Sequence, residues 1–321
     1  MVFSENKNPG KQEFTGGAFI WILTLLLISQ ALFGSNQIMG RFIEGEVPPI
    51  GLSFWRWIVA VLVVVPFTYT HINKFKSIIL HEWRLYLGLA FCLIVLGNTT
   101  IYIALNYTTA INAAIVSSVQ PAVTFALSWL FYREFASKGQ IAGAGIAVIG
   151  VLYIISRGDI LVLINLRPNP GDIWMIVSVI GFSMYAVLLK KLPPSVPALL
   201  TLNVIQLLGI ILLLPFYVWE FSYSQKMEFD KLTIISVLWA GIMVAVAAVG
   251  LWNYANLKLG ANKASGTIHL RLVMITIMAI ILLGEKLELF HLIAFGFIMA
   301  GIYAITRSGS NNMIIKEQKI I

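Results

Sequence analysis

Residues 102–134 read YIALNYTTAINAAIVSSVQPAVTFALSWLFYRE, and residues 253–285 read NYANLKLGANKASGTIHLRLVMITIMAIILLGE. Each stretch is mostly apolar, and each ends on a glutamate. A constant offset of 151 positions pairs identical residues between them: Ala104 with Ala255, Ala110 with Ala261, Ala113 with Ala264, and Glu134 with Glu285. Nearer the N-terminus, an offset of 149 pairs Pro48 with Pro197, Pro66 with Pro215, and Arg41 with Lys190. The chain is therefore an internal duplication.

The composition is that of an integral membrane protein. Of the 321 residues, 59% are hydrophobic and 11% are charged, and the mean hydropathy is +0.88. Soluble domains carry about 25% charged residues. The net charge of +8 fits cytoplasmic loops, which collect Lys and Arg, better than nucleic acid binding. With a single cysteine, Cys92, no disulfide scaffold or Cys-based metal cluster is expected, and neither a metal nor a cofactor is predicted.

Ten apolar segments are each long enough to cross about 30 Å of hydrocarbon. They span residues 17–41, 49–70, 85–106, 110–131, 139–156, 173–189, 198–219, 232–257, 261–283 and 290–306. Five segments fall in each half, and an odd number makes the second half enter the membrane from the opposite side. The predicted fold is all-α, with ten transmembrane helices as two inverted five-helix repeats, an arrangement used by secondary transporters. The alternative is that duplication simply made a larger bundle.

The distribution of positive charge predicts the orientation. With the N-terminus inside, the inner segments hold 14 of the 22 Lys and Arg and the outer segments hold six. This bias places both termini in the cytoplasm of a plasma membrane protein. The expected parts are an N-terminal tail (1–16), a first repeat (17–156), an external connector (157–172), a second repeat (173–306) and a C-terminal tail (307–321). A cleaved signal peptide is the alternative for the first segment, but its apolar run is long and the repeat requires it.

Several motifs, in their order and spacing, carry a family resemblance. They are Phe33-Gly-Ser-Asn36, Phe54-Trp-Arg-Trp57, Ala104-Leu-Asn-Tyr-Thr-Thr-Ala110, Ser118-Val-Gln-Pro121 and Arg133-Glu134. Over about residues 17–307 the chain resembles the EamA-type branch of the drug/metabolite transporter superfamily. That resemblance implies transport of small organic metabolites by alternating access, through a central cavity between the two halves. Two departures are Phe33, where the family usually has Trp, and Leu272, the partner of Pro121, where it often has Pro.

Arg271 is the leading candidate for substrate binding. It lies about ten residues into the segment 261–283, so about 15 Å deep, where an Arg costs about 2.5–3.5 kcal/mol on insertion scales. We expect it to face a polar cavity, and no Asp or Glu falls within the ten segments to pair with it. Such a guanidinium can hold a carboxylate or phosphate bidentately. The alternative is a structural role, tied to backbone carbonyls at the Pro121 kink or to Gln120, its repeat counterpart.

Two further titratable or charged residues lie inside spans. His269 is about 200° round a regular helix from Arg271, so it either borders the cavity or is a buried, hydrogen-bonded imidazole. If it faces the cavity, it titrates near neutral pH. Arg56 can snorkel to the interface or stack on Trp55 or Trp57, and it is interpreted, with Pro121, as structural or gating.

A set of polar and aromatic residues completes the predicted site. Asn98, Tyr102 and Asn106 follow one another at i, i+4 and i+8, which places them on one helix face. The other members expected to line the cavity are Asn36, Gln37, Tyr185, Trp252, Asn253 and Gln120. Each alone is more typical of interhelical hydrogen bonding, but together they indicate a polar cavity.

The sequence therefore predicts a secondary transporter for a small metabolite with an anionic group, such as an amino acid or carboxylate. Its partners would be that metabolite and the lipid bilayer, without nucleic acid, in a monomer or weak homodimer. Small residues at Gly139, Gly143 and Ala147, and at Gly296 and Ala300, favour close packing within the chain over dimerisation. A membrane transferase is the rival hypothesis, but the spans lack a carboxylate pair or nucleophile–base set. A transporter of neutral or cationic compounds, with Arg271 structural, is another.

Overall fold

The computed structural model describes residues 16–108, 113, 116–156, 158–165, 169–283 and 288–308. Every element in these ranges is a helix. Seven helices are long and apolar enough to cross a membrane: Ile20–Phe42, Pro49–His81, Trp83–Leu105, Pro170–Lys191, Ala198–Tyr223, Lys231–Leu259 and Leu289–Arg307. The prediction of an all-helical membrane protein is thereby confirmed.

In chain order the first half contains α1 (Gly16–Phe42), α2 (Pro49–His81), α3 (Trp83–Ala90), η1 (Phe91–Thr99), α4 (Thr100–Leu105), α6 (Gln120–Tyr132) and α7 (Lys138–Ser156). A short α8 (Ile160–Ile164) precedes the second half. That half contains α9 (Pro170–Leu188), η2 (Leu189–Lys191), α10 (Ala198–Tyr223), α11 (Lys231–Trp239), η3 (Ala240–Ala248), α12 (Val249–Leu259), α13 (Ala261–Gly266), α14 (His269–Leu283) and α15 (Leu289–Arg307).

Seven of the ten expected spans correspond to these long helices, and the other three remain predictions. The segment expected at 110–131 includes positions outside the described residues, and α6 covers only its second part. α7 (Lys138–Ser156) has 19 residues and coincides with the segment expected at 139–156. The segment expected at 261–283 is divided into α13 and α14. A hydropathy pattern does not reveal the break between α13 and α14.

The duplication is visible in the helix geometry. The third long helix of each half contains a nine-residue π-helical segment, η1 (Phe91–Thr99) and η3 (Ala240–Ala248). Their starts are 149 positions apart, which is the sequence offset of that region. Likewise α2 and α10 each follow a proline, Pro48 and Pro197, and each contains one, Pro66 and Pro215. π-Turns in helices occur frequently at functional sites.

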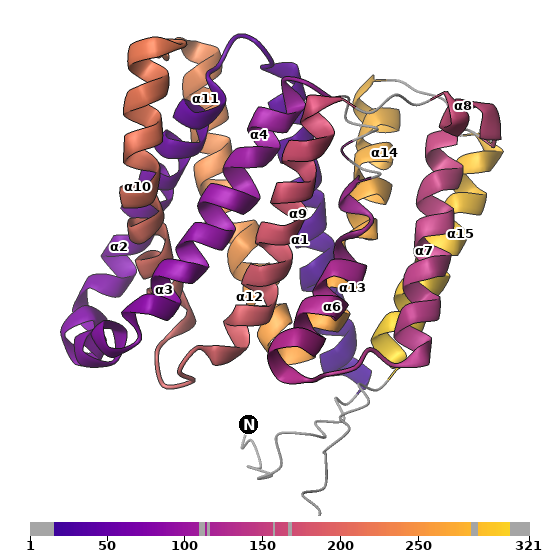
Figure 1. Ribbon diagram of the computed structural model, residues 1–321, viewed down its shortest axis with the longest axis horizontal. Coiled ribbons are helices and arrows are strands. Elements are labelled where there is room, and N and C mark those ends of the chain that lie inside the picture. Colours follow the sequence, from indigo (N-terminus) through magenta and orange to yellow (C-terminus); the bar gives the residue numbers. More distant parts are fainter. Residues whose placement is uncertain are drawn as a thin grey trace, which may run out of the picture.

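The helices of corresponding position also pair with one another in space. In Figure 1, α2 lies beside α10 at one side of the bundle, and α7 lies beside α15 at the other. The helices between them include α1, α9, α12 and α14. α1 begins and α15 ends at the same end of the bundle. A pair of equivalent helices on each flank therefore encloses the region where α1 contacts α14 and α6 contacts α9.

Glycine allows α7 and α15 to touch along their backbones. A Cβ at Gly143 would lie 2.6 Å from the carbonyl oxygen of Gly301, and one at Gly301 would lie 2.5 Å from that of Gly143. These distances are too short for any side chain. The small-residue stripe containing Gly143 therefore packs within the chain, as predicted, whereas a Cβ at Gly296 would meet nothing within 4 Å.

Candidate functional site

A cavity at the middle of the bundle, here called the central cavity, brings together the two halves of the chain. Its apolar and aromatic lining consists of Phe33, Leu93, Phe182, Tyr185, Val249, Trp252, Ala264 and Ile268. Its polar lining consists of Gln30, Gln120, Ser265 and Arg271. An apolar cavity with a few convergent polar groups is the usual form of a small-molecule site.

Arg271 supplies the positive charge of the central cavity. Its Nε donates a hydrogen bond to Oε1 of Gln30 at 3.2 Å. Its guanidinium carbon lies 4.9 Å from the ring centroid of Phe33, a cation–π contact. Both partners belong to α1, so α1 positions a guanidinium carried by α14. Gln30 was not singled out by the sequence, although it precedes Phe33 by one helical turn and so shares its face.

A second cavity, here called the lateral cavity, shares Arg271 with the central one. It is lined by Gln37, Ser117, Ser118, Val151, Ile268, His269, Arg271, Leu272 and Ile275. His269 is only 2% exposed, and neither ring nitrogen hydrogen-bonds another described residue. The expectation of a hydrogen-bonded buried imidazole is therefore wrong, and His269 faces a cavity.

His269 and Arg271 both belong to α14, but the first turn of this helix is tighter than a regular α-helix. α13 ends at Gly266, and α14 begins at His269. Around the break the backbone bonds span three residues, as from Arg271 N to Ile268 O at 2.9 Å and from Leu270 N to Thr267 O at 3.0 Å. Such tighter turns change the direction of successive side chains. Both residues consequently reach the same cavity.

Arg56 lies in a separate polar network within the first half. Its side chain is fully buried, and its Nη1 donates to the hydroxyl of Tyr102 at 2.8 Å. That hydroxyl in turn donates to Oδ1 of Asn36, also at 2.8 Å. The guanidinium lies 4.7 Å from the centroid of Trp57, so of the two predicted arrangements stacking is correct and snorkelling is wrong. The network joins α2, α4 and α1.

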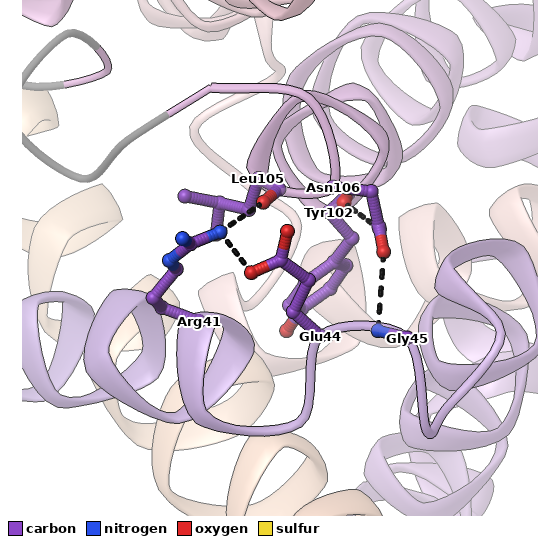
Figure 2. A network of polar contacts seen from close by, with 6 residues as sticks. All are labelled: Arg41, Glu44, Gly45, Tyr102, Leu105 and Asn106. Carbon is purple, nitrogen blue, oxygen red and sulfur yellow. Dashed lines mark hydrogen bonds and ion pairs between the residues drawn. The ribbon is translucent and has the colours of Figure 1, made fainter.

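The end of this network reaches a loop at the edge of the bundle. Asn106 donates to the backbone oxygen of Tyr102 at 2.8 Å and accepts from the backbone nitrogen of Gly45 at 3.4 Å. Figure 2 shows these bonds beside Arg41, which forms an ion pair with Glu44 and donates to the oxygen of Leu105 at 3.3 Å. Asn106 thus forms a hydrogen bond with the loop between α1 and α2, and it lines neither cavity.

The remaining predicted residues divide between the central cavity and the packing around it. Tyr185 and Trp252 line the cavity and stack on each other, with centroids 6.1 Å apart. Asn98 donates to the oxygen of Leu93 at 2.7 Å and so satisfies the backbone of its own π-segment. Asn253 is buried but lines neither cavity, and Pro121 lies in the first turn of α6 beside the cavity residue Gln120.

One buried acidic side chain lies at a helix end, one residue beyond the segment expected at 198–219. Glu220 is in the last turn of α10 and is 4% exposed. Its carboxylate accepts from the backbone nitrogens of Ile50 at 3.0 Å and Gly51 at 2.6 Å. It therefore caps α2 and is not a counter-ion for Arg271. No acidic residue of the described chain lines either cavity, and none of its described His, Cys, Asp and Glu side chains forms a group that could hold a metal.

Comparison with known proteins agrees with this arrangement. A family model described as the EamA-like transporter family matches residues 20–156 and again residues 169–307. The chain is 24% identical over 281 residues to the uncharacterized transporter YetK of Bacillus subtilis, covering 87% of this chain and 84% of that one. It is 25% identical over 282 residues to an uncharacterized transporter of Archaeoglobus fulgidus, covering 88% of this chain and 96% of that one. A solved crystal structure aligns with a TM-score of 0.69 at 15% identity, over 88% of this chain and 96% of the other, which shows the same fold.

Proposed function

Because the chain belongs to the EamA-like transporter family, we propose that it moves a small organic metabolite with an anionic group across the plasma membrane by alternating access. A membrane transporter function follows from the family. The anionic substrate is our proposal, and one observation supports it above the others. Arg271 lines both cavities, and no acidic residue in the described chain lines either of them.

The surroundings of Arg271 suit an anion held against an apolar body. A guanidinium presents five N–H donors, of which the bond to Gln30 uses Nε alone. In a low-dielectric cavity, a cation without an acid close by attracts a carboxylate or phosphate strongly. Phe182 and Trp252 offer apolar surface on the same cavity. An amino acid or another organic carboxylate fits this combination.

Alternating access rests on the pairing of the two halves. α1 packs on α14, and α6 packs on α9, which are equivalent contacts if the halves are exchanged. Two repeats of inverted topology could rock about a site between them. We propose this inverted arrangement, with both termini cytoplasmic and repeats at 17–156 and 173–306, as the framework for the movement.

The test is ligand binding to purified Arg271 variants. A thermal-shift screen against metabolites grouped by charge first identifies a ligand, because ligands that bind the native state raise its stability. Arg271→Gln copies the first-repeat residue Gln120 and should fold, yet bind anionic ligands about tenfold to a hundredfold more weakly, since a charge-assisted hydrogen bond contributes about 1.5–3 kcal/mol. Arg271→Lys keeps the positive charge but lacks the bidentate donor geometry of a guanidinium. It should therefore retain only part of the affinity for anionic ligands.

Arg84→Gln is the matched control, because it removes a positive charge whose guanidinium lies over the exposed ring of Trp83 rather than in a cavity. It should bind as the parent does. Anion binding by Arg271→Gln at the parental affinity would make Arg271 structural, held by Gln30 and Phe33.

A further inference from the structure

His269 is a buried titratable group that no other described residue satisfies. A neutral imidazole carries one donor nitrogen and one acceptor nitrogen, and neither is hydrogen-bonded here. Buried polar groups are almost always paired, so an exception calls for a function. The ring faces the lateral cavity, which it shares with Arg271 and with Gln37, whose Nε2 also lacks a partner.

Among the residues that the structure describes, Arg271 is the one charged group that shares this cavity with His269. The cavity lining otherwise consists of amide, hydroxyl and aliphatic side chains. α14 packs against α1, α7 and α15 and continues from α13. The titratable or charged residues described on those four elements, none of which lines the cavity, are Arg41, Lys138, Tyr153, Lys263, His291, Tyr303 and Arg307.

We propose that His269 is a proton-binding site coupled to anion binding through Arg271. The inference rests on the proposed function, since it requires an anion at Arg271. The proton comes from the aqueous phase and joins whichever ring nitrogen lacks one. With Arg271 uncompensated, a second positive charge in the same cavity is opposed by like-charge repulsion.

An anion bound to Arg271 removes this opposition. Arg271 lines both cavities, so an anion in the central cavity neutralises the charge that His269 meets in the lateral one. Each ligand then favours the other, because such coupling is reciprocal. The anion and the proton would travel together, and the transport cycle would be driven by a proton gradient without any carboxylate at the site.

Histidine NMR can test this directly because the chain has 4 His. The parent protein, labelled with ¹⁵N-histidine in lipid nanodiscs, is titrated with benzoate at about pH 6.5, where this carboxylate remains ionised. The His269 signals are assigned from His269→Gln. Saturating benzoate should raise the ratio of protonated to neutral His269 about tenfold, as expected for relief of one nearby charge. His71, His81 and His291 serve as internal references and should not change.

Two variants separate this proposal from the proposed function. His269→Gln should still bind benzoate, but its affinity should no longer vary with pH between about 5 and 8. Arg271→Gln should lose benzoate binding. If benzoate saturates the parent while the protonation of His269 stays constant, the coupling is refuted and the anion site stands. If neither benzoate nor inorganic sulfate binds the parent, the anion site fails and the coupling fails with it.

Discussion

Glu220 reaches from the last turn of α10 to the first turn of α2, where its carboxylate accepts a hydrogen bond from Gly51 N at 2.6 Å. It also accepts from Ile50 N, and Pro49 has no N–H, so a single side chain from the other half satisfies the start of α2. Unpaired N–H groups and the helix dipole both favour a negative charge at this position.

Glu220→Gln should therefore lower the free energy of unfolding by about 1–2 kcal/mol, because it retains the shape but loses the charge-assisted hydrogen bonds. Thermal unfolding monitored by tryptophan fluorescence measures the effect. Glu228→Gln, at an exposed loop position, is the control and should leave the melting temperature unchanged. Equal melting temperatures for the two variants would mean that the cap contributes no net stability.

Tyr102 is the centre of the network around Arg56, because its hydroxyl accepts from Arg56 Nη1, whereas Nε and Nη2 have no partner among the described residues. Tyr102→Phe removes the hydroxyl that accepts from Arg56 and donates to Asn36. It leaves a buried guanidinium nitrogen and a buried amide oxygen unpaired, which should cost about 2–4 kcal/mol of stability. Tyr254→Phe, at a position that is 42% exposed, is the matched control. Similar melting curves for both variants would show that water replaces the Tyr102 hydroxyl.

Substitution by alanine should change the melting temperature in opposite directions at two glycines of α7. Alanine is about 1 kcal/mol better than glycine in a helix. Gly145 meets nothing within 4 Å, so Gly145→Ala should raise the melting temperature. Gly143→Ala places a Cβ 2.6 Å from Gly301 O, which pushes α7 from α15 and should lower it. A gain in stability from Gly143→Ala would show that this contact relaxes readily.

The orientation in the membrane can be tested by cysteine labelling. In a Cys92→Ala background, Ser308→Cys at the end of α15 and Glu228→Cys between α10 and α11 report on opposite sides. With cytoplasmic termini, a membrane-impermeant maleimide applied to intact cells labels Glu228→Cys and spares Ser308→Cys. The reverse pattern would invert the predicted topology, and labelling of both from outside would overturn the scheme of paired five-helix halves.

How much of the site could be predicted depends on the regularity of the helix. Arg271 was identified because its depth and charge stand out in an apolar segment, and Gln120, Tyr185 and Trp252 share its cavity. His269 was placed away from Arg271 because a helical wheel assumes 3.6 residues per turn, whereas the first turn of α14 is tighter.

The partners of the two buried arginines were harder to foresee. Gln30 stands in a run of apolar residues, and only the packing of α1 on α14 makes it a neighbour of Arg271. Asn98 and Tyr102 were expected on one face, but the π-segment η1 lies between the regular helices and changes the angle between them. Tertiary contacts and helix irregularities therefore supplied what periodicity could not.

The Arg56 network has no equivalent in the second half. At the offset of 149, Arg56 corresponds to Ile205 and Asn36 to Tyr185, while Tyr102 corresponds to Asn253 at the later offset of 151. A chimera assembled from two copies of the first half would bury two such cations, one toward each face of the bilayer. A chimera of two second halves would bury none of them but would hold two copies of the Arg271 position. The two halves are therefore not interchangeable, since only their combination buries one Arg56 and one Arg271.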